Sequence, residues 1–212
     1  MTQIVWIARH GNRLDFVKPE WFNTAPKRYD PPLSDDGVIQ AQELAQRMQS
    51  TKITHIFASP FLRTIQTAFE VAKVLNMPIK IEAGLSEWLN SDWMDETPET
   101  ESQEWLNEQY PLIDRNYQSF CQPQYPETRA QLNQRTAKTV NHLVQEFSQD
   151  ILIVGHGGSV FGVTKGLVPE VETFKVSLCS LTKVVRQKDN WQAELIADTS
   201  HLSQTEKTYR LN

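Results

Sequence analysis

The sequence lacks the features that mark several common classes of protein. It has only two cysteines, Cys121 and Cys179, which are too few for a scaffold held by several disulfides. No run approaches the ~18 consecutive apolar residues of a membrane helix, and the first residues have neither the basic start nor the apolar core of a secretory signal. We therefore expect a cytoplasmic protein with free thiols and no membrane partner.

The sequence also lacks an excess of basic residues. It contains 21 lysines and arginines against 26 aspartates and glutamates, which gives a formal net charge of −5. Proteins that bind nucleic acid or anionic membranes through charge usually carry a basic excess. We therefore expect no nucleic-acid partner, although a local basic pocket remains compatible with this balance.

Apolar runs and amphipathic segments alternate along the 212 residues. Short β-branched runs predict strands, and apolar residues at a spacing of three to four predict helices between them. The predicted strands are 3–8, 53–58, 79–82, 151–154, 173–186 and 191–197, and the predicted helices are 34–49, 59–76, 127–148 and 158–167. We expect Ser34 to cap the first of these helices and Ser59 to cap the second. This alternation predicts an α/β fold, a three-layer sandwich with a mostly parallel central sheet and helices on both faces.

Residues 88–126 interrupt this alternation with an irregular, aromatic and acidic stretch. Because the chain shows no repeat and no clear linker, we expect one domain over residues 1–212 with 88–126 inserted as a small cap. Long loops in compact domains are often functional, so the cap could contact the substrate. The alternative is a small hydrophobic cluster with a solvated acidic face.

Charged side chains follow four of the predicted strands. In an open α/β sheet, ligands bind beyond the carboxyl ends of the strands. The side chains found there are Arg9, His10, Arg13, Arg63, Glu87 and His156. Arginines clamp phosphate oxygens, a neutral histidine can attack phosphorus, and one carboxyl group can protonate the leaving oxygen. The set therefore indicates phosphoryl transfer, but the residue types alone leave open which histidine attacks.

Five segments resemble the signature of the histidine phosphatase superfamily, also called the phosphoglycerate-mutase-like superfamily. They are residues 4–11, 32–41, 59–68, 84–87 and 154–157, in the order of the family. The resemblance implies a phosphatase that hydrolyses phosphomonoesters without a metal or other cofactor, through a phosphohistidine. Arg13 follows Arg9-His10-Gly11 at a spacing that resembles the branch of tyrosine-phosphatase-like and steroid-phosphate phosphatases.

The resemblance also implies a role for each candidate residue. His10 would be the nucleophile and His156 would complete the phosphate pocket. Glu87 would be the general acid and then the general base, although Glu82, Asp92, Asp95 and Glu96 are alternative acids in the neighbouring sequence. The substrate-binding residues would be Arg9, Arg13, Arg63 and Gly157. For Arg13, a salt bridge with Asp15 or Asp30 is the alternative to contact with the substrate.

Two other functions compete with a phosphatase. The first is a phosphoglycerate-type mutase, and the second is a non-catalytic module that binds a phosphorylated ligand. No histidine pair has metal-ligand spacing beside cysteines or carboxylates, so we expect no metal, and we interpret His55, His142 and His201 as structural or solvated. The expected substrate is a small phosphomonoester or a phosphoprotein.

Overall fold

A six-stranded sheet forms the centre of the molecule in the computed structural model, which describes residues 2–188 and 190–204. The strands are β1 (Ile4–Arg9), β2 (His55–Ala58), β3 (Ile79–Ile81), β4 (Ile151–Gly155), β5 (Leu181–Gln187) and β6 (Asn190–Asp198), in the order β3-β2-β4-β1-β5-β6. The first four in this order are parallel, β5 runs antiparallel to β1, and β6 runs antiparallel to β5. The prediction of a mostly parallel sheet is confirmed. The predicted domain also includes residues 1, 189 and 205–212, which lie outside the described residues.

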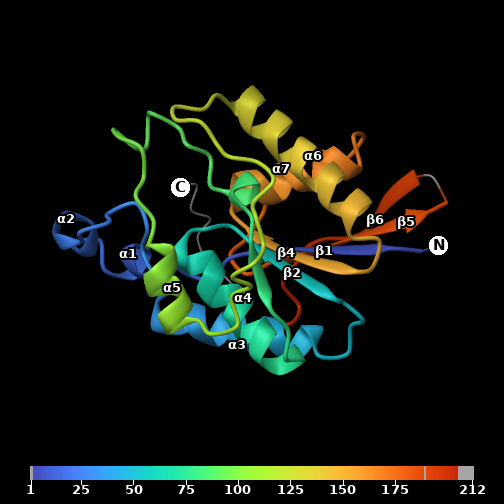
Figure 1. The fold of residues 1–212 in the computed structure, drawn as a ribbon, viewed down its shortest axis with the longest axis horizontal. Helices are drawn as coiled ribbons and strands as arrows, with labels where there is room; N and C mark the ends of the chain where they lie inside the picture. The colour runs from blue at the N-terminus through green and yellow to red at the C-terminus, as the bar shows by residue number, and fades with distance from the viewer. Residues whose placement is uncertain (1, 189, 205–212) are drawn as a thin grey trace.

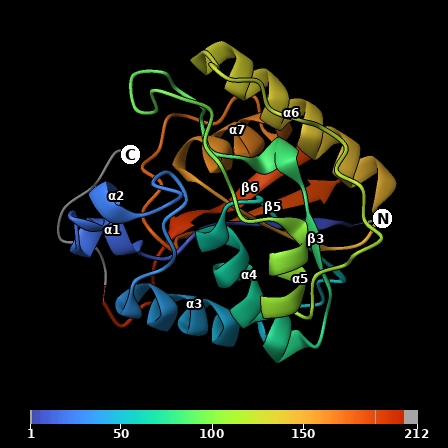
Figure 2. The same cartoon turned by 60° about the vertical axis from the view of Figure 1, so that its left-hand side comes forward.

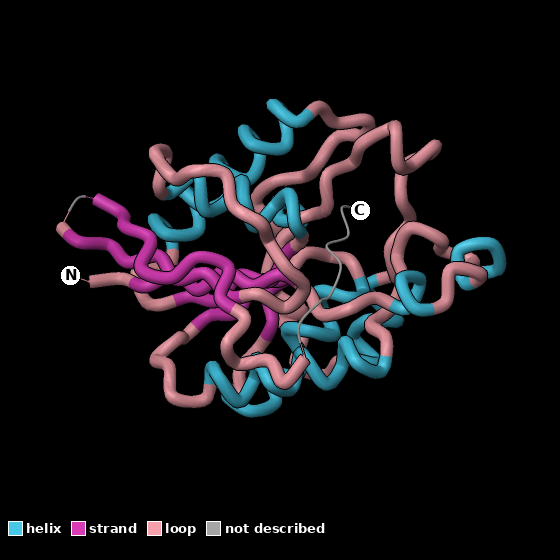
Figure 3. The backbone as a smooth tube through the Cα atoms, turned by 180° about the vertical axis from the view of Figure 1, so that it is seen from behind, coloured by secondary structure: helices cyan, strands magenta, loops and turns pink. Residues whose placement is uncertain are grey.

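Helices cover both faces of the sheet, as predicted. They are α1 (Leu14–Val17), α2 (Trp21–Thr24), α3 (Asp35–Met48), α4 (Leu62–Leu75), α5 (Gln103–Gln109), α6 (Arg129–Glu146) and α7 (Gly157–Leu167), with a 3₁₀ turn, η1, at Ala83–Leu85. In Figure 1, α6 and α7 lie above the sheet and α3 and α4 below it, and Figure 3 shows the strands between these two layers. Among the described residues, no helix combines the length and the apolar character needed to cross a membrane.

The alternation of side chains along β1 explains why both faces carry helices. Val5 and Ile7 are buried with apolar residues of α6 and α7, whereas Trp6 and Ala8 are buried with residues of α3 and α4. Successive side chains of a strand point to opposite faces, so an uninterrupted apolar run requires cover on both sides. Each large side chain buried in this way contributes roughly 1.5–3 kcal/mol, which makes the run a reliable signal for a central strand.

Helix α3 begins as the sequence predicted, but α4 does not. Ser34 caps α3 by accepting a hydrogen bond from the Gly37 amide. We predicted that Ser59 would cap α4, but this helix begins at Leu62, and the Leu62 amide donates to the Asp30 carboxylate over 2.7 Å. The prediction was wrong because a residue 32 positions earlier supplies the cap, which local sequence does not reveal.

Three further segments differ from the prediction. Residues 173–180 were predicted as part of a strand but lie outside the sheet, because Cys179 takes a left-handed φ of 54° and its amide donates to the His10 carbonyl. The 88–126 stretch contains helix α5, which Ser102 caps. Figure 2 shows α5 against α4, where Leu106 packs on Ile65. The one-turn helices α1 and α2 were also not predicted.

Candidate active site

His10 follows β1 at the carboxyl edge of the parallel strands and is fully buried. Its Nδ1 lies 2.7 Å from the Gly11 carbonyl oxygen, and a carbonyl accepts only from a protonated nitrogen, so the proton is on Nδ1. Nε2 is buried and makes no hydrogen bond within residues 2–188 and 190–204. Burial, then the charges of Arg63 and Arg9, hold the pKa of His10 well below its usual value. The ring is therefore neutral, with an unprotonated nitrogen available to an electrophile.

His156 lies beside His10 at the start of α7. The two ring centroids are 5.3 Å apart. His156 Nε2 lies 2.8 Å from the Ser59 hydroxyl, and Nδ1 lies 3.4 Å from Glu87 Oε2. Burial, followed by the charge of Arg63, lowers the pKa of His156 as well. Ser59, predicted as a helix cap, thus has a different role: it orients a histidine of the site.

Glu87 is the carboxylate closest to both histidines among the candidate acids. One carboxylate oxygen accepts a hydrogen bond from the Trp88 amide over 2.9 Å. The other lies 3.6 Å from Arg63 Nη2 and 3.4 Å from His156 Nδ1. The side chain is buried. This arrangement leaves Glu87 able to exchange a proton with a group bound between the histidines.

The other acids that the sequence offered are engaged elsewhere. Glu82 is fully buried and accepts hydrogen bonds from Gly84 N, Tyr117 Oη, Ser119 Oγ, Phe120 N and Cys121 N. Asp95 bonds the side chains of Arg28 and Tyr29, and Asp92 and Glu96 are exposed. The structure therefore brings Glu87, and none of these four, beside His156.

Arg63 supplies a buried positive charge next to Glu87. Its Nη1 donates to the Tyr29 carbonyl over 3.3 Å and lies 3.8 Å from Asp30 Oδ1. The guanidinium also lies 4.7 Å from the centre of the Phe61 ring. Burial, then the charge of Arg13, lowers the pKa of Arg63 to about 10, so it remains charged at neutral pH. A buried cation of this kind favours an anionic ligand.

Arg9 and Arg13 extend this positive region in different ways. Arg9 is buried, and its Nη1 donates to the Val176 carbonyl over 2.8 Å. A Cβ on Gly157 would lie 3.7 Å from the Arg9 guanidinium carbon, so Gly157 places the first turn of α7 beside that cation. Arg13 forms a two-bond salt bridge with Asp15, both bonds 2.7 Å long. The predicted alternative for Arg13 is therefore present, while its charge still lowers the pKa of His10.

The turn that carries His10 packs closely against the start of α3, and both segments require a glycine at the contact. A Cβ on Gly37 in α3 would lie 2.0 Å from the Asn12 carbonyl oxygen, and one on Gly11 would lie 2.5 Å from the Gly37 carbonyl oxygen. Real side chains do not approach backbone atoms so closely. The start of α3 and the turn after β1 therefore pack backbone to backbone, which fixes the position of His10.

Three of the site residues also form a group that could hold a metal ion. His10, Glu87 and His156 each place one possible ligand atom within 4.8 Å of the other two. Reading spacings along the chain missed this group, because the residues lie on three separate strand ends. The surroundings favour an anion instead, since Arg63 lies 3.6 Å from the same carboxylate and arginine charges lower the pKa of His10.

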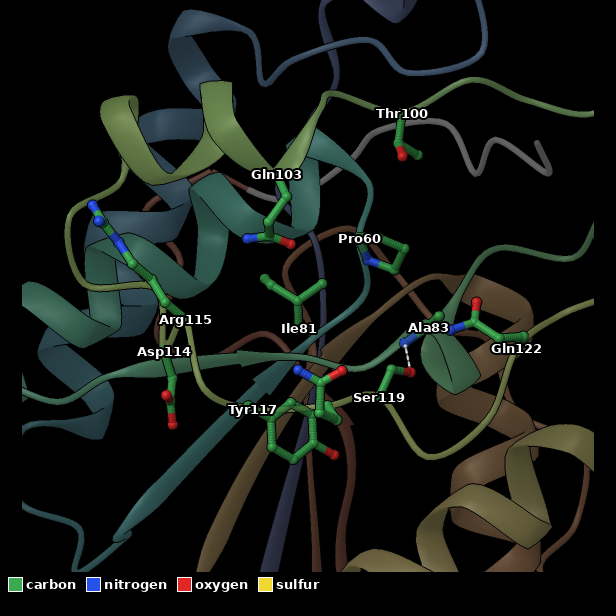
Figure 4. Close-up of a pocket in the computed structure, with 11 residues that line it drawn as sticks. Pro60, Ile81, Ala83, Thr100, Gln103, Asp114, Arg115, Tyr117, Ser119 and Gln122 are labelled. Atoms are coloured by element: carbon green, nitrogen blue, oxygen red, sulfur yellow. Dashed lines mark hydrogen bonds between the residues drawn. The ribbon is translucent and has the colours of Figure 1, made fainter.

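A polar cleft of about 450 Å³ lies beside the site but contains none of the predicted site residues. Figure 4 shows Thr100 and Gln103 on one side of it and Tyr117 and Ser119 on the other. Ser119 Oγ accepts a hydrogen bond from the Ala83 amide. The 88–126 segment thus encloses a cleft that borders the loop leading from β3 to Glu87.

Sequence reasoning missed Ser59, Asp30 and the buried ion pair of Arg135 with Glu127. Ser59 and Asp30 give no local signal, because their partners are distant in sequence. Arg135 does give one: it lies in α6 among the buried Leu132, Thr136 and Thr139. A charged residue on the buried face of a helix requires a partner.

Comparison with known proteins places this geometry in a family. The chain is 30% identical over 79% of its length to the transcription factor tau 55 kDa subunit of Saccharomyces cerevisiae, of which it spans only 41%. It is also 30% identical to the "Probable phosphoglycerate mutase GpmB" of Proteus mirabilis, with 94% of each chain covered. Among solved structures, the ecdysone phosphate phosphatase of Bombyx mori, in complex with tungstate, has the same fold. It shows 21% identity and a TM-score of 0.80, and the match covers 99% of this chain and 98% of that one.

The family itself follows from a match over most of the chain. Residues 5–199 match the family model described as "Histidine phosphatase superfamily (branch 1)". The matched region contains every strand and helix of the described fold apart from the first residue of β1. The chain belongs to the histidine phosphatase superfamily.

Proposed function

We propose that this protein is a phosphatase that hydrolyses phosphomonoesters through a phosphohistidine at His10, without a metal. The observation that carries the proposal is the state of the His10 ring: Nδ1 is fixed by the Gly11 carbonyl, and the buried Nε2 has no hydrogen-bond partner in the described part of the chain. Arg9 and Arg63 are buried around it. A neutral nitrogen nucleophile in a positively charged pocket suits attack on a phosphate.

In the first step, His10 Nε2 attacks phosphorus. The P–N bond forms as the bond from phosphorus to the ester oxygen breaks, and protonated Glu87 gives its proton to that oxygen. The imidazole becomes positively charged, and its Nδ1–H still donates to the Gly11 carbonyl. Arg9 and Arg63 stabilise the charge on the phosphoryl oxygens.

In the second step, water attacks the phosphohistidine. The Glu87 carboxylate takes a proton from the water as the new P–O bond forms and the P–N bond breaks. Inorganic phosphate leaves, the His10 ring is neutral again and Glu87 is protonated for the next cycle. His156, held by Ser59, contacts the phosphoryl group in both steps.

A hydrolysis assay with p-nitrophenyl phosphate tests this mechanism. We expect turnover that persists in EDTA, acid-quenched protein that carries labelled phosphate, and loss of both in His10→Ala. Glu146→Gln, which changes an exposed carboxylate at the end of α6, is the matched control and keeps both. Activity abolished by EDTA overturns the metal-free mechanism, and equal labelling of His10→Ala overturns the nucleophile.

We also propose that residues 88–126 form a cap that contacts the leaving group. Trp88 and Trp93 meet edge to face at 5.0 Å, and Leu89 and Met94 pack with Phe61 next to the site. Trp93 is 40% exposed. An apolar wall of this kind suits the leaving group of a small phosphomonoester or of a phosphorylated protein side chain. We further propose that the protein acts in the cytoplasm, where the free Cys121 and Cys179 stay reduced.

A phosphoglycerate-type mutase is the second candidate, because GpmB matches 94% of this chain. A mutase must return the phosphoryl group to an organic acceptor instead of water. Asp95 and Glu96 pair with Arg28. The exposed Asp92, Glu99 and Glu104 are therefore the cap acids that would oppose a substrate with a second anionic group, which favours the phosphatase. Isomerisation of 3-phosphoglycerate that depends on 2,3-bisphosphoglycerate, at a rate above hydrolysis, would reverse this choice.

A non-catalytic module that binds a phosphorylated ligand is the third candidate, since the yeast relative is named as a transcription factor subunit. Here His10, Glu87 and His156 all lie within reach of one another, which favours an enzyme. Tight binding of vanadate or phosphate, with no hydrolysis of any aryl phosphate, would favour the module instead.

A further inference from the structure

The guanidinium of Arg135 makes a complete set of hydrogen bonds inside the protein. Arg135 lies in α6 and is 6% exposed. Nε and Nη2 donate to the two carboxylate oxygens of Glu127, each over 2.7 Å. Nη1 donates to the carbonyls of Gly84 (2.9 Å) and Ser86 (3.2 Å), and Nη2 also donates to the carbonyl of Glu87 (3.1 Å). All five N–H groups of the side chain are therefore used.

Three of these five bonds hold the loop that carries Glu87. The carbonyl groups of Gly84, Ser86 and Glu87 itself converge on one rigid, planar group. Glu127 adds two more ties, because its amide donates to the Leu89 carbonyl over 2.8 Å and its carbonyl accepts from Trp88 Nε1 over 2.7 Å. The backbone on both sides of Glu87 is therefore fixed to the start of α6.

From this geometry we infer that Arg135 is a positioning residue for Glu87, and that Glu127 orients the guanidinium. The inference rests on the proposed function, in which Glu87 transfers protons to and from the substrate. The carboxylate is placed through its own backbone: Arg135 fixes the Glu87 carbonyl, and the Trp88 amide bonds Oε1 over 2.9 Å. Arg135 does not touch the substrate.

The exchange of arginine for lysine separates this role from a requirement for charge. Lysine keeps the positive charge but has three donors on one nitrogen and no planar fork. It can pair with Glu127 but cannot also hold three carbonyl groups. Arg135→Lys therefore keeps the ion pair and releases the loop, whereas a purely electrostatic role would survive the exchange.

The test measures kcat/KM for phosphomonoesters whose leaving groups range from p-nitrophenol to a simple alcohol. Since kcat/KM reports the step that phosphorylates His10, it is sensitive to protonation of the leaving oxygen. We expect Arg135→Lys to lower kcat/KM for the alkyl ester roughly 100-fold, the range of a misplaced general acid. The p-nitrophenyl ester, whose leaving group needs no proton, should change little.

Leu143→Ala is the matched control for lost stability. Leu143 is buried in α6, eight positions beyond Arg135, and shares an apolar cluster with Leu85, but its removal leaves all five hydrogen bonds of Arg135 in place. Leu143→Ala should lower Tm without changing how kcat/KM depends on the leaving group. Glu127→Gln keeps one carbonyl acceptor for the guanidinium, so it should also lower kcat/KM for the alkyl ester, but by a smaller factor. This variant replaces Arg135→Lys in the test if Arg135→Lys does not fold.

Glu87→Gln, measured in parallel, distinguishes the two proposals. If Glu87→Gln steepens the leaving-group dependence and Arg135→Lys behaves as Leu143→Ala does, the positioning role is overturned and the proposed function stands. If the wild type neither turns over an ester nor forms phosphohistidine, the proposed function fails and the positioning role fails with it. Hydrogen exchange of the 84–89 amides should be faster in Arg135→Lys than in Leu143→Ala.

Discussion

Asp30→Asn should make the protein more stable at neutral pH. Asp30 is buried, and its Oδ1 accepts the Leu62 amide at the start of α4 and lies 3.8 Å from Arg63. Burial outweighs both interactions and raises the pKa of Asp30 from 3.8 to about 6. The folded state therefore holds a proton at a pH where the unfolded chain has released it.

The sign and size of the effect follow from this shift. Because the folded pKa is raised, the stabilising contribution of protonated Asp30 is present below about pH 4 and is lost as pH rises through about 6. A shift of about two units corresponds to roughly 3 kcal/mol at ~1.4 kcal/mol per unit. Asparagine keeps an oxygen that can accept the Leu62 amide and carries no charge to desolvate. Asp30→Asn should therefore gain up to ~3 kcal/mol at pH 7 and nothing at pH 4.

Urea unfolding of the wild type and of Asp30→Asn at intervals from pH 4 to pH 8 measures this difference. The two curves of unfolding free energy should meet at the acid end and separate between pH 4 and pH 6. Asp92→Asn, which changes an exposed carboxylate, controls for the loss of one negative charge. Parallel curves across the whole range would refute the reasoning, since they would show that Asp30 does not titrate differently in the folded state.

Three other predictions concern the histidines and their support. Gly37→Ala should destabilise the protein by ~1–3 kcal/mol and lower kcat, because its Cβ would lie 2.0 Å from the Asn12 carbonyl oxygen; thermal unfolding and turnover check both. Ser59→Ala should lower kcat about 10-fold with little change in Tm, because it removes a hydrogen bond of 2.8 Å to His156; an unchanged kcat would contradict that role. The pKa of His10 is lowered by burial and by Arg63, so Nε2 stays unprotonated at pH 6.5; a fall of kcat/KM toward acid pH that assigns protonation of His10 a midpoint at or above 6.5 would contradict this.

The elements that the sequence predicted well are those whose signals are local. The apolar runs of β1 and β4 need no partner to be recognised, because each is buried on both faces. The start of α3 is marked by Ser34, which accepts a hydrogen bond from the amide three residues later, and by the acidic residues of the first turn. For the same reason the strand ends could be predicted, and with them the location of His10, Glu87 and His156 at one edge of the sheet.

The features that escaped prediction depend on contacts across the chain. The cap of α4 comes from Asp30, the bond that orients His156 comes from Ser59, and the residues before β5 leave the sheet to meet His10. In each case the residue type is compatible with several partners, and only the tertiary packing determines which partner it contacts. Arg135 is the exception, because a cation among the buried residues of α6 already indicates a buried partner of opposite charge.

The strand order has a consequence for how the protein is made. β4 lies between β1 and β2, and Val5 pairs with Ile151, so the strands that carry His10 and lead to Arg63 do not meet directly. During synthesis, which runs at ~5–20 residues per second, both must wait for the strand that also delivers His156. A nascent chain that ends before Ile151 therefore lacks the strand that joins the two parts of the sheet. Such distant pairing is slow to form, so the candidate active site is assembled among the last parts of the molecule.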